Sequence, residues 1–94
     1  MLYITLKNAL VKGSVDINDY VIDFSPDDHI VGLEILNLFN NLSNLPRDAD
    51  IVNCQLDIRY NKNNTVIIAM VLLKSGQTIQ ANVPLLVPIP IRDR

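Results

Sequence analysis

The side chains that could do chemistry are few, and most of them are carboxylates. Asp27 and Asp28 directly precede His29, which is the only histidine of the chain. Carboxylates and imidazoles bind metal ions, but a metal site needs three or more ligands that converge from different directions. Neighbours within one turn do not supply this by themselves. Because Ser25 and Pro26 come just before, we interpret the segment as a turn capped by an aspartate and predict no metal site.

Glu34 is the second candidate for chemistry. It lies in an alternating segment, on the face opposite Val31, Leu33 and Ile35. Buried against a partner, Glu34 could act as a general base together with a nearby aspartate or His29. The ordinary role of such a residue is solvation, or pairing across the sheet with a Lys or Arg. We therefore assign no catalytic residue from the sequence.

Three further aspartates, Asp16, Asp19 and Asp23, form an acidic strip near one predicted hairpin. Asp16 and Asp19 fall on opposite faces if the strand continues, so they do not form a carboxylate pair. The strip is typical of a solvated surface that keeps a hairpin soluble.

The single cysteine, Cys54, excludes an internal disulfide and a cysteine-based zinc site. It alternates in phase with Val52, Leu56 and Ile58, on the apolar face of its segment. A free cysteine in that position behaves as a small hydrophobe. We expect a buried thiol with low reactivity.

Composition excludes several classes of function. The chain has 94 residues, which is one domain (residues 1–94), and its net charge is −2 with a pI of about 5.0. The eight cationic side chains are spread along the chain, so we expect no nucleic-acid partner. The three glycines are scattered and open no helix, so no cofactor is expected. Nothing resembles a signal peptide or a membrane span, and we expect a cytoplasmic protein without membrane contact.

Hydrophobic alternation predicts the elements that hold these residues. Strands are expected at residues 2–6, 15–17, 20–24, 29–36, 52–60, 65–73 and 78–83, with turns between them. Asn37 is a helix N-cap candidate, followed by Leu38, Leu42 and Leu45, and Pro46 ends that helix. The predicted fold class is α+β: a mostly antiparallel sheet of six or seven strands, with one short helix packed on one face.

Residues 66–73 are apolar at every position, so both faces of this strand require cover. One face can take the helix, and the other needs a second layer or another subunit. An extended arm, residues 84–94, adds apolar residues between Pro84, Pro88 and Pro90. We therefore predict a homo-oligomer, most simply a dimer. Its interface is predicted to contain Val66, Ile68, Met70, Leu85, Leu86, Val87, Ile89 and Ile91.

Residues 2–42 resemble a family catalogued as domain of unknown function 2283. Its members share a Leu-Tyr-Ile-x-Leu strand, an acidic stretch ending in Val-Ile-x-Asp-Tyr, and a Val-Gly-Ile-Glu-Ile-Leu segment before a helix. These elements are read here at residues 2–6, 19–24 and 31–36. The family pattern includes Glu34, but it has Gly where Tyr20 and Asp28 stand and an extra opening strand. Residues 58–70 are similar to that opening hairpin, which leaves a partial second copy and a chance likeness as alternatives.

Because that family is uncharacterised, the resemblance implies a fold and no reaction. Three functional classes remain open. The first is a non-enzymatic, self-associating protein that acts as a protein-interaction module. The second is an antitoxin-like accessory partner in a two-gene module, whose apolar arm would wrap its partner. The third and weakest is a small enzyme that uses Glu34 with an aspartate or His29.

Overall fold

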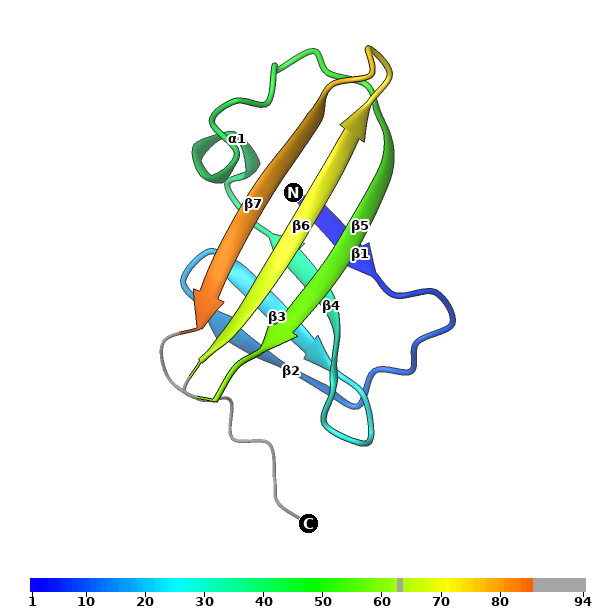
Figure 1. Cartoon of the computed structure of the whole chain (residues 1–94), viewed down its shortest axis with the longest axis vertical. Coiled ribbons are helices and arrows are strands. Elements are labelled where there is room, and N and C mark those ends of the chain that lie inside the picture. The colour runs from blue at the N-terminus through cyan, green and yellow to red at the C-terminus, as the bar shows by residue number, and fades with distance from the viewer. Residues whose placement is uncertain (63, 86–94) are drawn as a thin grey trace.

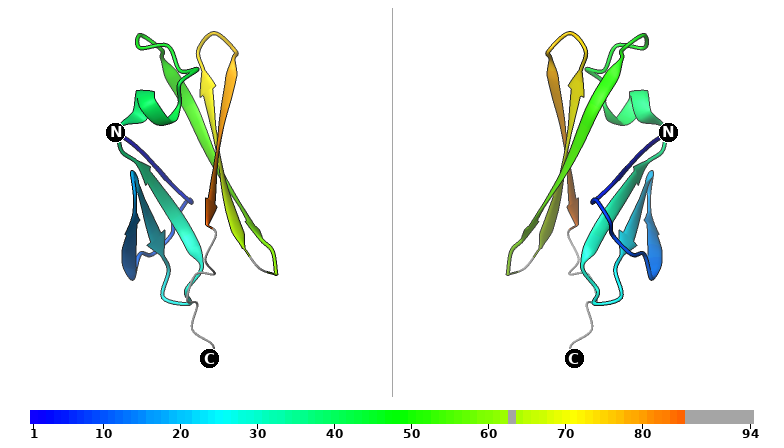
Figure 2. Two further views of the ribbon diagram at one scale, coloured as in Figure 1. Left: turned by 90° about the vertical axis from the view of Figure 1, so that its left-hand side faces the viewer. Right: turned by 90° about the vertical axis from the view of Figure 1, so that its right-hand side faces the viewer.

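The computed structural model describes residues 1–62 and 64–85, which form two antiparallel sheets packed face to face (Figures 1 and 2). The first sheet has the strand order β1-β4-β3-β2, and the second has the order β5-β6-β7. The elements, in chain order, are β1 (Leu2–Thr5), β2 (Gly13–Ile17), β3 (Tyr20–Phe24), β4 (Ile30–Ile35), α1 (Leu38–Asn41), β5 (Ile51–Tyr60), β6 (Thr65–Leu73) and β7 (Thr78–Leu85).

The first sheet is a β2-β3-β4 meander to which β1 is added beside β4. Its tight turns use residues that tolerate a left-handed backbone: Asn18, between β2 and β3, has φ 53°, and Asp28, between β3 and β4, has φ 64°. The register shifts between Asp23 and Phe24, where Phe24 pairs with Ile30. Because of this bulge Ile30 joins the core cluster, a place that strict alternation gives to Val31.

The second sheet consists of two hairpins that share the central strand β6. Gly76, with φ 95°, makes the turn between β6 and β7. Leu73 donates its N–H to the Gln77 carbonyl, so these two residues form a hydrogen-bonded pair. Hydrogen-bonded pairs recur at every second residue of the ladder, so Val71 and Ile79 form the next one. Counted in this way, Pro84, opposite Val66, stands at a non-hydrogen-bonded position. Its missing N–H therefore faces the open edge and removes no bond from the sheet.

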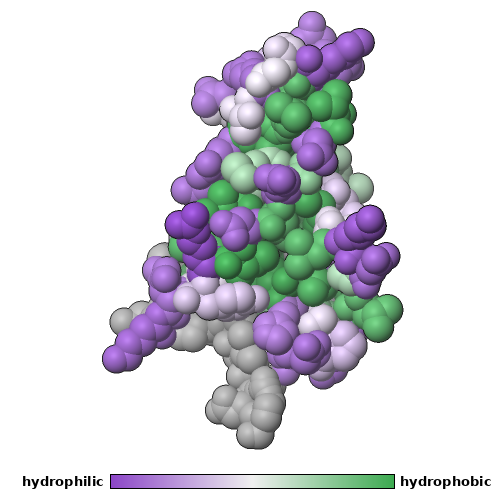
Figure 3. Space-filling model, turned by 45° about the vertical axis from the view of Figure 1, so that its right-hand side comes forward, coloured by the Kyte–Doolittle hydropathy of each residue, from purple (hydrophilic) through white to green (hydrophobic). Residues whose placement is uncertain are grey.

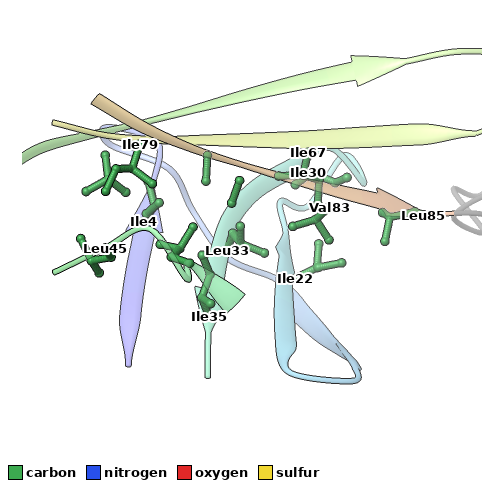
Figure 4. Packing of buried hydrophobic residues seen from close by; sticks show 14 of the residues in the cluster. Ile4, Ile22, Ile30, Leu33, Ile35, Leu45, Ile67, Ile79, Val83 and Leu85 are labelled. Carbon is green, nitrogen blue, oxygen red and sulfur yellow. The ribbon is translucent and has the colours of Figure 1, made fainter. Parts of the chain in front are cut away.

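The core lies between the two sheets, where their inward side chains meet (Figure 4). Ile22, Leu33 and Ile35 come from the first sheet, and Ile67 and Val71 come from the second; all five are fully buried. Each such side chain contributes about 1.5–3 kcal/mol relative to an exposed one. The facing layer that covers β6 is therefore the chain's own first sheet.

The prediction of a single sheet of six or seven strands is wrong, because the seven strands divide into a four-stranded and a three-stranded sheet. The antiparallel character is confirmed, since every paired strand is antiparallel. The division follows from the connection between β4 and β5, residues 36–50, which carries the chain from one layer to the other (Figure 2). Alternation fixes which side chains share a face, but it does not say whether two hairpins share a sheet.

The predicted helix is also much shorter than its leucine spacing suggests. α1 has four residues, and Asn37 before it is left-handed (φ 48°) with no side-chain capping bond. Asn37 instead donates its side-chain amide to Asp19 at 3.1 Å. Leu42 leaves the helical conformation, yet Leu42 and Leu45 are buried at 3% and 5% exposure. An irregular connection therefore fills the end of the sandwich where a helix on a sheet face was predicted.

The described residues contain no helix with the length and apolar character needed to cross a membrane. β7 runs through Leu85, so the first two residues of the predicted arm extend this strand. The rest of the arm, residues 86–94, lies outside the described residues.

Candidate functional site

Polar side chains gather on the outward face of the first sheet. The strand register aligns them in two rows. One row runs Tyr3, Glu34, Val21 and Asp16, and the other runs Thr5, Gly32, Asp23 and Ser14. Three of the chain's ten acidic residues thus share this face, although they are far apart in the sequence.

Asp23 is the centre of this face and is 7% exposed. Its carboxylate accepts hydrogen bonds from the Tyr3 hydroxyl and the Ser14 hydroxyl, each at 2.6 Å. Gly32 lies between Asp23 and β1, and a Cβ there would stand 2.8 Å from Asp23 Oδ2 and 3.3 Å from Tyr3 Oη. The absence of a side chain at Gly32 therefore lets Tyr3 reach across β4 to Asp23. Two short hydrogen bonds to a buried carboxylate are a strong interaction.

The hydrogen bond that Tyr3 donates to Asp23 raises the pKa of the Tyr3 hydroxyl above its ordinary value of 10.0, with a further contribution from burial. The hydroxyl therefore stays protonated at neutral pH and acts as a donor, not as a nucleophile. The hydroxyl groups of this cluster donate to its own carboxylate. The cluster is therefore a structural cross-link between β1, β3 and β2.

Glu34 lies on the same face, paired with Tyr3 on one side and Val21 on the other. It is half-buried. His29 precedes the other end of β4, and five residues of strand separate it from Glu34 by about 16 Å. The structure therefore does not bring Glu34 and His29 together. Asp23, on the strand beside Glu34, already accepts two hydrogen bonds.

The Asp27-Asp28-His29 segment is a turn, as predicted. Ser25 donates its hydroxyl to Asp27 at 2.9 Å and accepts the His29 N–H at 3.1 Å. His29 Nδ1 lies 3.3 Å from the exposed Asp27 carboxylate, and the Ser25 hydrogen bond is the main reason that the pKa of Asp27 is lowered. Asp28 lies 3.9 Å from Lys12. Within residues 1–62 and 64–85, no group of three or more metal-ligating side chains comes together.

The acidic strip predicted from Asp16, Asp19 and Asp23 separates in the fold. Asp16 and Asp23 share the outward face of the first sheet, but Asp16 is exposed and Asp23 is buried in the cluster described above. Asp19 holds the β4–α1 connection: it accepts the side-chain amides of Asn37 and Asn41 at 3.1 and 3.2 Å, and its carbonyl accepts the Leu36 N–H. Two of the three aspartates are therefore structural acceptors.

Cys54 is half-buried against the core, and burial raises the pKa of its thiol. This agrees with the predicted apolar environment, although the side chain is less enclosed than a core position. A thiol with a raised pKa is poorly ionised at neutral pH and is a weak nucleophile.

The residues of the predicted oligomer interface fall into three groups. Val66, Ile68 and Met70 lie in the outward row of β6 and are half-buried. Leu85 is 3% exposed and belongs to the chain's own core, so its assignment to an interface is corrected. Leu86, Val87, Ile89 and Ile91 lie outside the described residues.

Sequence reasoning missed the Tyr3–Asp23–Ser14 cluster. Alternation placed Tyr3 and Asp23 on polar faces, but the three residues come from three strands, and only the register brings them together. The sequence signal that could have revealed the cluster is Gly32, in the middle of a strand of larger residues. A glycine at such a position indicates that another group approaches the backbone closely.

Residues 1–38 match the model of a family described as protein of unknown function (DUF2283). The predicted resemblance to this family is thereby confirmed for the segment that forms β1 to β4, the whole first sheet. The second sheet lies outside the match. No curated protein and no solved structure matches the chain.

We predict that Gly32→Ala destabilises the fold by about 1–3 kcal/mol, because the new methyl group would stand in the Tyr3–Asp23 contact. Urea denaturation measures the change. Gly13→Ala is the matched control, since nothing lies within 4 Å of its Cβ position. Equal stability of the two variants would show that the close approach at Gly32 does not contribute to the stability of the fold.

A second prediction follows from the raised pKa of Tyr3. Because the folded pKa is above the unfolded value of 10.0, its contribution to stability is complete below that value and is lost as pH rises through the folded pKa. The free energy of unfolding, measured from about pH 8 to about pH 11, should fall less steeply in Tyr3→Phe than in the wild type. The same slope in the wild type and in Tyr3→Phe would contradict the assignment.

A third prediction is that a thiol reagent labels Cys54 slowly at neutral pH, because the raised pKa leaves little thiolate. Labelling should accelerate once denaturant exposes the side chain. Rapid stoichiometric labelling of the folded protein would show that the thiol is ionised and accessible.

Proposed function

We propose that this protein is a non-enzymatic interaction module that self-associates, most simply as a homodimer. The observation that supports this is the outward face of the second sheet. There the central strand β6 presents an apolar row of Val66, Ile68, Met70 and Leu72, and Leu72 is 37% exposed. Apolar residues at the centre of an outward sheet face are typical of an interface.

The residues beside this apolar row are polar and mostly uncharged. In the register, Ile68 stands between Asp57 and Asn82, and Met70 stands between Gln55 and Gln80. Gln80 donates to Asn82 at 2.9 Å within its own strand. Interfaces between proteins are depleted of charge at the centre and polar at the rim, which is the pattern of this face.

The first sheet supports a different role. On its outward face the buried Asp23 carboxylate is engaged by hydrogen bonds from Tyr3 and Ser14. A catalytic site needs a group that is free to exchange protons or attack a substrate. The enzyme hypothesis built on Glu34 and His29 therefore has the least support, because these residues lie at opposite ends of β4. The antitoxin-like alternative shares the apolar surface with the proposal and differs in the identity of the partner.

The prediction is that light scattering at micromolar concentration gives about 21 kDa, twice the 10.6 kDa of one chain. Removal of residues 86–94 should weaken association, because their aliphatic side chains are part of the proposed interface. The shortened chain must end after Leu85, since this residue is in the core. A monomer mass for the full chain at every concentration would overturn the proposal. If the mass and the melting temperature are unchanged after truncation, residues 86–94 are not part of the interface.

A further inference from the structure

We propose that self-association takes place by strand pairing: β5 of one copy pairs antiparallel with β5 of a second copy, about a twofold axis at Ile58. The three-stranded sheets of the two copies then join into one continuous sheet. The inference rests on the proposed self-association and adds a contact at the β5 edge, a surface separate from the outward row of β6.

The direction of the backbone groups of β5 follows from its hairpin with β6. Asn61 donates its N–H to the Asn64 carbonyl at 2.8 Å, so these two residues form a hydrogen-bonded pair. Hydrogen-bonded and non-hydrogen-bonded pairs alternate along an antiparallel ladder. Residues 59, 57 and 55 therefore bond to β6, whereas the N–H and C=O groups of Tyr60, Ile58 and Leu56 point to the other side. No described strand pairs with β5 on that side.

β5 is the longest of the four edge strands, with ten residues against four in β1, five in β2 and eight in β7. Natural sheets protect long edges with proline, lysine or a bulge. β7 carries Pro84 at its open edge, and β2 is short and exposed. β5 contains neither proline nor lysine, and its register irregularity lies at its first residues, near Ile51. The stretch from Leu56 to Tyr60 is therefore a regular strand edge.

The charges of β5 match a second copy of the same strand. Asp57 and Arg59 are its only charged residues, and both are on the outward face, with side chains 52% and 66% exposed. Antiparallel pairing centred on Ile58 places Asp57 of each copy opposite Arg59 of the other. These are non-hydrogen-bonded pairs, in which side chains approach most closely. A twofold axis at Asp57 or Arg59 would instead oppose like charges.

The inward side chains of the same edge are apolar and incompletely covered. Leu56 and Ile58 are half-buried, and Tyr60 is 48% exposed. Pairing centred on Ile58 sets Leu56 opposite Tyr60 of the second copy and Ile58 opposite itself. Figure 3, turned so that the β5 side comes forward, shows apolar side chains gathered over this part of the molecule.

The connection between β1 and β2 projects beyond β5 in Figure 1, and Figure 2 places it in the layer of the first sheet. Leu10 and Val11 of this connection are 73% and 48% exposed. A strand added beside β5 would extend the other layer and give these two side chains an apolar surface to face.

The test uses Asp57→Arg and Arg59→Asp in the full chain, with dimer dissociation measured by analytical ultracentrifugation. Each single variant opposes like charges twice across the axis, and we expect its dissociation constant to rise about tenfold or more.

An equimolar mixture of the two single variants should form a heterodimer of wild-type affinity. Positions 57 and 59 are both positive in the Asp57→Arg chain and both negative in the Arg59→Asp chain, so every pair across the axis joins opposite charges. The intrachain contact between residues 57 and 59, 3.4 Å in the wild type, is lost in both variants, so this rescue comes from pairing between chains.

The outcomes separate the two proposals. A wild-type monomer at every concentration overturns self-association and this inference together. A wild-type dimer that is equally stable in both single variants overturns the pairing of β5 and leaves self-association standing. Weakening without rescue in the mixture overturns the register centred on Ile58. Thermal unfolding of each variant, read at a concentration where all are monomers, shows that the folds are intact.

Discussion

The burial of one face of each sheet against the other is the constraint on which this structure depends. Ile22 and Leu33 on the first sheet and Ile67 and Val71 on the second are almost completely removed from water. A slip of one residue in a strand with a buried face would turn its apolar set outward, so the core fixes the register of these strands. The same register determines which polar side chains meet on the outside. The Asp23 cluster exists because the register places Ser14 and Asp23 in one row with Gly32, across which Tyr3 reaches Asp23.

The strands could be predicted because each has a solvent side and a core side, which period-two alternation records directly. The strand predicted at residues 65–73 has the bounds of β6, and its inward residues are covered. The sequence could not show that the cover on the inner face is the chain's own first sheet. That outcome depends on a connection between β4 and β5 whose leucines, Leu42 and Leu45, are buried without being helical. Leucines spaced three or four residues apart can mark the buried face of a helix or buried positions in an irregular segment, and the sequence does not distinguish the two.

The candidate site was less predictable than the fold, because its residues are distant in sequence and ordinary in type. Alternation assigns Asp23 to a solvated strip, yet this residue is buried and accepts two short hydrogen bonds. Glu34 and His29 form a candidate pair only because the chain offers few other groups, and strand geometry separates them. Burial of an aspartate depends on donors from neighbouring strands, which alternation does not reveal.

The two sheets therefore differ in what they leave for other molecules. On the outward face of the first sheet, which carries the family match, Tyr3 and Ser14 donate hydrogen bonds to Asp23. The second sheet has an apolar central strand, an edge strand that contains Pro84, and an edge strand with exposed Asp57 and Arg59. An exposed ion pair adds at most about 1 kcal/mol to the stability of a monomer, so its value to the fold alone is small. Across a twofold axis the same two charges are used twice and oppose incorrect registers. In the proposed pairing of β5, these two charges therefore have a larger effect between chains than within one.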